Sequence, residues 1–449
     1  MSRRYFGTDG VRGRVGTQPM TAEFALRLAG AAARILTPTG GKVLVGKDTR
    51  LSGYMFESAI EAGFVAAGAD VLLMGPLPTP GIAYMVQRLG CDFGAVISAS
   101  HNPYDDNGIK FFDRTGAKLA DELEERIEGL LDEPAPTRES AALGRASRVD
   151  RERVLYQQFC AATLPAGMNL QGFKLVIDCA NGAAYKVAPR VLADLAADVV
   201  PIGCSPNGRN INDGCGSTHP ALLQMTVAGV RADAGIALDG DGDRIVMVDH
   251  LGRVVDGDQL LYVLARAGLA DGTLRGPVVG TVMSNFGLEL ALRELGIPFL
   301  RAAVGDRYVL QLLREHGGTL GGESSGHLLC LGHTTTGDGL VVALQVLAVM
   351  KQTGQSLAEL AAGMHRLPQH MINVRVVRRF DAGADPAVLD VVHGVEQALA
   401  GRGRVVLRPS GTEPVIRVMV EGEDAGVVAR HAATIARAVE VAAAQRAAN

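Results

Sequence analysis

The sequence predicts an α/β protein with three similar α/β domains followed by a smaller C-terminal α+β domain. Two observations carry this prediction. A short apolar run, a small-residue turn, a helical stretch and a second apolar run occur three times in this order, which is typical of β-α-β units. The C-terminal segment instead alternates apolar and polar residues, as half-buried strands do. The length of 449 residues also exceeds the ~250–300 residues that one hydrophobic core supports.

Each copy of the repeat contributes two strands that flank a helix. In such units the loops after the strands lie at one edge of the sheet, where ligands bind. The paired runs are residues 43–46 and 69–75, 174–178 and 197–203, and 277–281 and 295–300. In the C-terminal segment we expect strands at 373–377 and 415–420 and a closing helix at 424–447.

Changes in composition indicate the domain boundaries. Residues 133–148 are rich in proline, alanine and serine, so we expect an exposed linker there. Further breaks are expected near residues 252–257 and at Leu367-Pro368. The predicted domains are residues 1–150, 151–253, 254–366 and 367–449.

The composition excludes several classes of function. There are 44 Lys and Arg against 48 Asp and Glu, and the net charge of −4 offers no basis for binding nucleic acid or an anionic membrane. The six cysteines form no C-x-x-C pair, and the longest apolar stretch, residues 340–350, is shorter than the ~20 residues of a membrane span. The N-terminal residues do not resemble a signal peptide. We therefore expect a cytoplasmic protein.

Three aspartates separated by single glycines follow the apolar run 236–238: Asp239, Asp241 and Asp243. The glycines allow a loop in which the carboxylates converge. Three such charges repel one another unless a cation holds them, and oxygen ligands favour Mg²⁺ or Ca²⁺. The alternative is a solvated acidic turn, but the position directly after a buried strand favours a metal site.

A second candidate segment, residues 98–103, follows the apolar run 94–97 and contains Ser100. A serine at the end of a strand, in a turn fixed by Asn-Pro, is placed as a nucleophile or phosphate carrier must be. Lys110 supplies a nearby cation. The alternatives are an ordinary Asn-Pro turn with a capping serine and a surface lysine.

A third candidate is a glycine-flanked loop with a carboxylate, a hydroxyl and an imidazole, at residues 321–327 with Glu323, Ser325 and His327. These groups fit a loop that binds a polyol and transfers protons. The loop also matches G-x-S-x-G formally, with Asp338 and His365 following in hydrolase order. That interpretation needs a clear strand before the serine, and residues 317–320 form a poor one. A flexible polar loop is the remaining alternative.

The fourth candidate lies between the two C-terminal strands. Arg408, Ser410, Gly411, Thr412 and Arg417 combine two guanidinium groups, two hydroxyls and an open backbone. Such a set suits a phosphate dianion. The alternative is a simple β-turn.

Together the four segments resemble the signature motifs of the α-D-phosphohexomutases, in the family's order and across essentially the whole chain. The segments are ISASHNP at 97–103, DGDGDR at 239–244, GESSGH at 322–327 and RPSGTEP at 408–414. Four further segments resemble the branch of the family that acts on amino sugar phosphates: residues 6–13, 46–50, 305–308 and 334–339.

This resemblance implies α/β sandwich domains with mixed sheets and an active site in a central cleft. It implies that phosphorylated Ser100 converts glucosamine 6-phosphate into glucosamine 1-phosphate through glucosamine 1,6-bisphosphate, feeding UDP-N-acetylglucosamine and cell-wall synthesis. It also implies one Mg²⁺ per subunit, a small-molecule sugar phosphate as partner and a possible homodimer.

The resemblance further implies a role for each candidate residue. Ser100, Asp239, Asp241 and Asp243 would hold the metal, Lys110 and His327 would move the hydroxyl proton, and Arg12 and Arg244 would stabilise the transferring group. Glu323 and Ser325 would bind the sugar, and Arg408, Ser410, Gly411, Thr412 and Arg417 would hold the second phosphate. The alternatives are a glucose or mannose phosphate mutase of the same family, a serine-dependent phosphatase, and a sugar-phosphate binding protein without catalysis.

Overall fold

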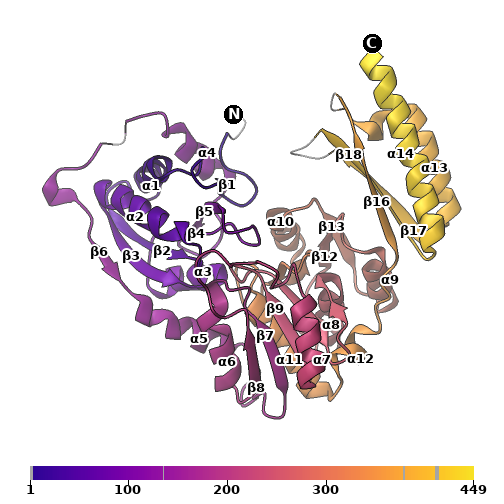
Figure 1. Cartoon of the computed structure of the whole chain (residues 1–449), viewed down its shortest axis with the longest axis horizontal. Coiled ribbons are helices and arrows are strands. Elements are labelled where there is room, and N and C mark those ends of the chain that lie inside the picture. Colours follow the sequence, from indigo (N-terminus) through magenta and orange to yellow (C-terminus); the bar gives the residue numbers. More distant parts are fainter. Residues whose placement is uncertain (1–3, 135, 378–379, 410–413, 449) are drawn as a thin grey trace. The chain divides into compact units, whose positions relative to one another are not determined.

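The chain divides into two compact units, one of Met1–Thr281 with Ala302–Ala362 and the other of Val282–Arg301 with Gly363–Asn449. The first unit carries successive α/β sheets, and the second carries an antiparallel sheet (Figure 1). The structure is a computed structural model that describes residues 4–134, 136–377, 380–409 and 414–448.

The first sheet has the strand order β1-β5-β4-β2-β3-β6. It is mixed, because β5 runs antiparallel to β1 and β4 while the pairs β2-β3, β2-β4 and β3-β6 are parallel. The elements are β1 (Val11–Arg14), α1 (Ala22–Leu36), β2 (Gly41–Lys47), α2 (Ser52–Ala66), β3 (Ala69–Pro76), α3 (Thr79–Arg88), β4 (Phe93–Ile97), β5 (Asp106–Asp113), α4 (Asp121–Gly129) and β6 (Ala146–Arg148). The expected linker at 133–148 thus ends in an edge strand, β6, because its last residues pair with β3.

Helices cover both faces of this sheet, and the alternation along β2 explains how. Val43 and Val45 point to one face, where they share a core with Phe56 and Phe64 of α2. On the other face Gly46 leaves room for α3, since a Cβ there would lie 2.2 Å from the Ile82 side chain. The result is the predicted α/β sandwich.

The second sheet has the order β11-β10-β9-β7-β8. It is also mixed, since β7 runs parallel to β8 and β9 while β10 is antiparallel to β9. Its strands and the neighbouring helices are α5 (Arg153–Ala162), β7 (Lys174–Asp178), α6 (Ala188–Asp194), β8 (Asp198–Ile202), α7 (Ala221–Val230), β9 (Ala234–Leu238), β10 (Ile245–Asp249) and β11 (Val254–Val255).

In the third sheet β14 pairs in parallel with β12 and antiparallel with β15. The elements are α8 (Gly257–Ala270), β12 (Val278–Thr281), α9 (Phe286–Glu294), β13 (Phe299–Ala302), α10 (Asp306–His316), β14 (Leu320–Gly322), β15 (Leu328–Cys330), α11 (Gly339–Thr353) and α12 (Leu357–Ala361). The predicted strand at 295–300 begins only at Phe299, because Gly296 takes a positive φ of 72° after α9 and Pro298 cannot donate to a ladder. The apolar run 340–350 lies in the buried helix α11, and among the described residues no helix has the length and apolarity that a bilayer crossing requires.

The second unit contains an antiparallel sheet with β18 between β16 and β17. Besides α9, which falls within Val282–Arg301, its elements are β16 (Gln369–Arg375), α13 (Pro386–Leu399), β17 (Gly403–Pro409), β18 (Val415–Gly422) and α14 (Ala425–Ala448). Both helices pack on one face of the sheet, where Val418 and Val420 meet Val388, Ile435 and Val439 (Figure 1). The predicted fold class, three α/β domains with mixed sheets and a smaller C-terminal α+β domain, is therefore confirmed, while the domain boundaries remain predictions.

Candidate active site

Three loops of the first unit meet at the carboxyl ends of β4, β9 and β14. We call them the serine loop (98–103), the aspartate loop (239–244) and the glutamate loop (322–327). The Ser100 hydroxyl donates to Asp239 Oδ2 at 2.6 Å. The next strand, β10, fastens the glutamate loop, since the Ile245 amide donates to the Gly326 carbonyl at 3.0 Å. The loops that the sequence singled out in this unit are thus neighbours in space.

Ser100 is buried and takes a left-handed backbone conformation with φ of 52°. This conformation is uncommon for a residue other than glycine and costs about 1–3 kcal/mol, so it persists only where the surroundings enforce it. The Ser100 amide donates to the Ser98 hydroxyl at 3.0 Å, which is one such restraint. The hydroxyl of Ser100 is thereby directed at the aspartate loop rather than at solvent.

The three aspartates fit a divalent cation. Asp239, Asp241 and Asp243 are buried, and one oxygen of each lies within 4.8 Å of the others. Asp241 Oδ1 and Asp243 Oδ1 are buried, and within the described part of the chain neither accepts a hydrogen bond. Burial raises the pKa of Asp239, and the charges of Asp241 and Asp243 raise it further. A bound cation would coordinate the oxygen atoms that lack hydrogen-bond donors, and it would offset the repulsion among the three carboxylates.

Two buried nitrogen groups border the three aspartates, which we call the triad. Lys110 Nζ lies 2.8 Å from Asp241 Oδ2 and 3.7 Å from Asp243 Oδ2. His327 Nδ1 lies 3.6 Å from Asp243 Oδ1. Burial lowers the pKa of each group, but neighbouring carboxylates outweigh it, so the pKa of Lys110 is raised and that of His327 is raised to about 9. The neighbouring carboxylates thus favour the protonated form of both side chains.

The two predicted arginines lie beside these groups. Arg244 Nε is 4.0 Å from Asp243 Oδ1, and the Arg244 amide donates to Asp239 Oδ1 at 3.2 Å. Arg12 pairs with Asp9. Asp9 also forms an ion pair with Lys110, at 3.0 Å. The Asp9 carboxylate therefore connects Arg12 to the network of charged groups around the aspartates.

Several residues of this network have no role that the sequence predicts. Asp9 and Asp306 both pair with Lys118, the latter at 2.6 Å, and Asp306 Oδ2 lies 3.4 Å from His327 Nε2. Both aspartates fall in segments that carried the family resemblance, which was the signal available. The Thr79 hydroxyl donates to Asp241 Oδ2 at 2.7 Å, and no motif marked this first residue of α3.

The glutamate loop is a turn between two strands. Glu323 accepts from the Gly305 amide at 2.9 Å and from the Ser325 hydroxyl at 3.3 Å. A short strand does precede the formal G-x-S-x-G match, but strand β15 follows it where a nucleophile elbow needs a helix. Asp338 instead caps α11 and accepts from the Tyr156 hydroxyl at 2.7 Å. The hydrolase interpretation is not supported.

The predicted phosphate site lies in the second unit. Arg408 of β17 and Arg417 of β18 are directly paired across the two strands. Like charges at such positions repel each other, and burial together with Arg417 lowers the pKa of Arg408. An anion between them would remove this repulsion. Ser410, Gly411 and Thr412 lie outside the described residues.

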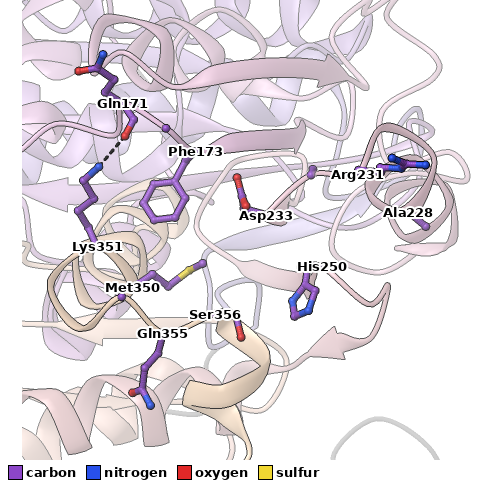
Figure 2. A pocket seen from close by; sticks show the side chains of 13 residues that line it. Gln171, Phe173, Ala228, Arg231, Asp233, His250, Met350, Lys351, Gln355 and Ser356 are labelled. Carbon is purple, nitrogen blue, oxygen red and sulfur yellow. Dashed lines mark hydrogen bonds between the residues drawn. The ribbon is translucent and has the colours of Figure 1, made fainter.

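A separate pocket of about 640 Å³ in the first unit contains none of the predicted site residues. Lys351 lies on one side of this pocket, where it donates to the Gln171 carbonyl at 2.6 Å, and Arg231 lies on the opposite side (Figure 2). His250 and Asp233 lie between them (Figure 2). These polar groups do not converge on one point, in contrast to those around the triad.

Comparison with known proteins decides the family. Domain profiles described as phosphoglucomutase/phosphomannomutase match residues 3–137 (alpha/beta/alpha domain I), 157–252 (domain II), 256–367 (domain III) and 371–438 (C-terminal domain). The chain belongs to the phosphoglucomutase/phosphomannomutase family. Within this family, a phosphoglucosamine mutase of Alkalilimnicola ehrlichii is 58% identical over 440 residues, 98% of either chain.

Solved structures of phosphohexomutases share the fold. A phosphoglucomutase/phosphomannomutase family protein of Burkholderia thailandensis superposes with a TM-score of 0.79 at 24% identity, covering 97% of both chains. The N-acetylphosphoglucosamine mutase of Aspergillus fumigatus, solved with GlcNAc-6P and magnesium, superposes with a TM-score of 0.68 at 18% identity, covering 98% of this chain and 96% of that one. The resemblance found in the four sequence motifs is thus confirmed at the level of the family and the fold.

Proposed function

We propose that this chain is a phosphoglucosamine mutase, an isomerase that interconverts glucosamine 6-phosphate and glucosamine 1-phosphate. The observation that carries the proposal is the 2.6 Å contact of the Ser100 hydroxyl with Asp239, at the edge of a buried three-aspartate cluster. A nucleophile beside a cation site suits phosphoryl transfer, which depends on positioning and on charge neutralisation. The 58% identity to a full-length relative of that name supports the choice of an amino sugar.

In the proposed reaction, phosphorylated Ser100 is the donor. The bond between phosphorus and Ser100 Oγ breaks as phosphorus bonds to the oxygen at position 1 of glucosamine 6-phosphate. The hydroxyl at that position loses its proton. The resulting glucosamine 1,6-bisphosphate reorients, and Ser100 Oγ then takes the phosphoryl group from the 6 position. The 6-oxygen leaves with a proton, which completes glucosamine 1-phosphate and restores phosphoserine.

The residues of the first unit supply the chemistry of both transfers. Asp239, Asp241, Asp243 and an oxygen on Ser100 would hold Mg²⁺, which neutralises charge on the transferring group when bound. Arg244 and Arg12 add positive charge beside it. For the hydroxyl proton we propose Lys110 or His327, the two nitrogen groups that border the triad.

Recognition of the substrate uses the remaining candidate residues. Glu323 and Ser325 would bind the sugar hydroxyls, and Arg408 and Arg417, with Ser410, Gly411 and Thr412, would hold the phosphate that does not react. We further propose a cytoplasmic homodimer whose product feeds UDP-N-acetylglucosamine and cell-wall synthesis.

Competing substrates test this function. We expect kcat/KM for glucosamine 6-phosphate to exceed that for glucose 6-phosphate or mannose 6-phosphate by about tenfold or more, because a site that hydrogen-bonds a substrate group discriminates against analogues without it. Each sugar phosphate would be assayed with a catalytic amount of its own bisphosphate. Equal turnover of a neutral sugar phosphate would point to another mutase of the family, and rapid release of free phosphate would point to a phosphatase; either result contradicts the proposal.

A further inference from the structure

Two buried side chains from separate parts of the sequence hold the same two carbonyl groups of the serine loop. Arg50, which follows β2, donates from Nη2 to the Ser100 carbonyl at 3.2 Å and to the Asn102 carbonyl at 2.5 Å. Asn212, from a loop between β8 and α7, donates from Nδ2 to the same carbonyls at 2.9 and 3.0 Å. The backbone on either side of His101 is therefore held twice.

Both donors are themselves anchored. Arg50 is fully buried, pairs with Asp48 and also donates to the Pro103 carbonyl at 3.4 Å. Its planar guanidinium can reach several acceptors at once, which a lysine ammonium does not reproduce. The backbone amide of Asn212 donates to the Ala180 carbonyl at 2.9 Å, which anchors Asn212 to the loop that follows β7.

The aspartate loop closes the third side of this arrangement. A Cβ on Gly240 would lie 2.6 Å from the Ser100 carbonyl oxygen and 2.8 Å from Asn212 Nδ2. The backbone between Asp239 and Asp241 therefore packs directly against the carbonyl that Arg50 and Asn212 hold. Asn212 and the aspartates lie in loops that follow two strands of the same sheet, β8 and β9. The hydrogen bonds from Asn212 therefore fix the serine loop relative to the metal ligands.

We infer that Arg50 and Asn212 are positioning residues that clamp the serine loop so that Ser100 keeps its left-handed conformation and faces Asp239. Within the described residues neither side chain hydrogen-bonds Ser100 Oγ, so they act through the backbone.

The clamp also has a chemical purpose. Phosphorylation adds a charge of about −1.5 to −2 to Ser100, and the backbone must keep one geometry in both charge states for transfer in both directions. This role in turnover rests on the proposed function.

The test is Asn212→Gly, because Asn212 has a φ of 58° that glycine adopts without strain while the amide donor is lost. We expect kcat to fall about 10- to 100-fold, while KM for glucosamine 6-phosphate changes less than about threefold. A misplaced reacting group slows the chemical step but leaves substrate binding largely intact. Arg50→Lys, which keeps the charge beside Asp48, should show the same split. Asn210→Gly is the matched control, since Asn210 lies in the same loop but donates to the Ser205 carbonyl instead.

A second readout does not depend on the substrate. Amide hydrogen exchange in the peptide that covers residues 98–103 should accelerate in Asn212→Gly and Arg50→Lys and stay unchanged in Asn210→Gly. Unchanged exchange in both clamp variants would overturn the clamp itself. Faster exchange with kcat retained, or with KM rising as kcat stays constant, would overturn its role in turnover. If the wild type fails to convert glucosamine 6-phosphate, the proposed function fails, while the exchange result still decides whether the clamp exists.

Discussion

Replacement of Ser100 by alanine is expected to reduce mutase turnover by about 10⁴-fold or more, because loss of a covalent nucleophile leaves only binding and electrostatic effects. The substitution removes one oxygen atom from a buried position, so the fold should persist. The measurement is the conversion of glucosamine 6-phosphate in a coupled assay, together with the melting temperature of the variant.

Ser100→Gly gives an independent check of the same point. Glycine accepts the φ of 52° at this position, so a loss of turnover there cannot be attributed to backbone strain. Turnover near the wild-type rate in either variant would exclude Ser100 as the phosphoryl carrier. It would then be necessary to seek the carrier among the other groups that face the triad.

The second large effect is expected for Asp241→Asn. This isosteric change removes one of three negative charges from the cluster, so the affinity for Mg²⁺ should fall and kcat/KM should drop about 10³-fold at a fixed Mg²⁺ concentration. Thermal unfolding gives a readout without catalysis. A ligand at 100 times its Kd stabilises a protein by about 2.7 kcal/mol, and this Mg²⁺-dependent gain should largely disappear in the variant.

Asp249→Asn is the control for this experiment. Asp249 is a buried aspartate at the end of β10, but its carboxylate binds the Leu251 and Arg253 amides rather than the cluster. Its replacement should lower stability while the response to Mg²⁺ remains. An identical Mg²⁺ response in Asp241→Asn and the wild type would remove the proposed metal site.

The sequence predicted those parts of the fold and site that local patterns encode. The strands β4 and β9 are short apolar runs, and the polar loops that follow them are where the serine and the aspartates meet. Strand β6 was not predicted and falls within the expected linker at 133–148, because an exposed edge strand of three residues has little apolar pattern. Pairing with β3 decides its structure, and this contact lies far away in the sequence.

The same reason explains which site residues escaped prediction. Thr79 and Asn212 contact the site across 162 and 112 residues of sequence, and neither stands in a motif with recognisable chemistry. Arg50 lies in a segment that carried the resemblance, but only the folded chain shows that its guanidinium reaches the carbonyls of the serine loop. Contacts of this kind are set by topology, so a local reading of the chain does not find them.

The most direct test of the central claim is the mass of the protein after incubation with glucosamine 1,6-bisphosphate. We expect wild-type chains to gain about 80 Da, one phosphoryl group, with fragment masses that assign the group to Ser100, and we expect Ser100→Ala to gain nothing. Addition of excess glucosamine 6-phosphate should then remove the group from the wild type. An active enzyme that never carries this mass, or that carries it at another residue, would contradict the account.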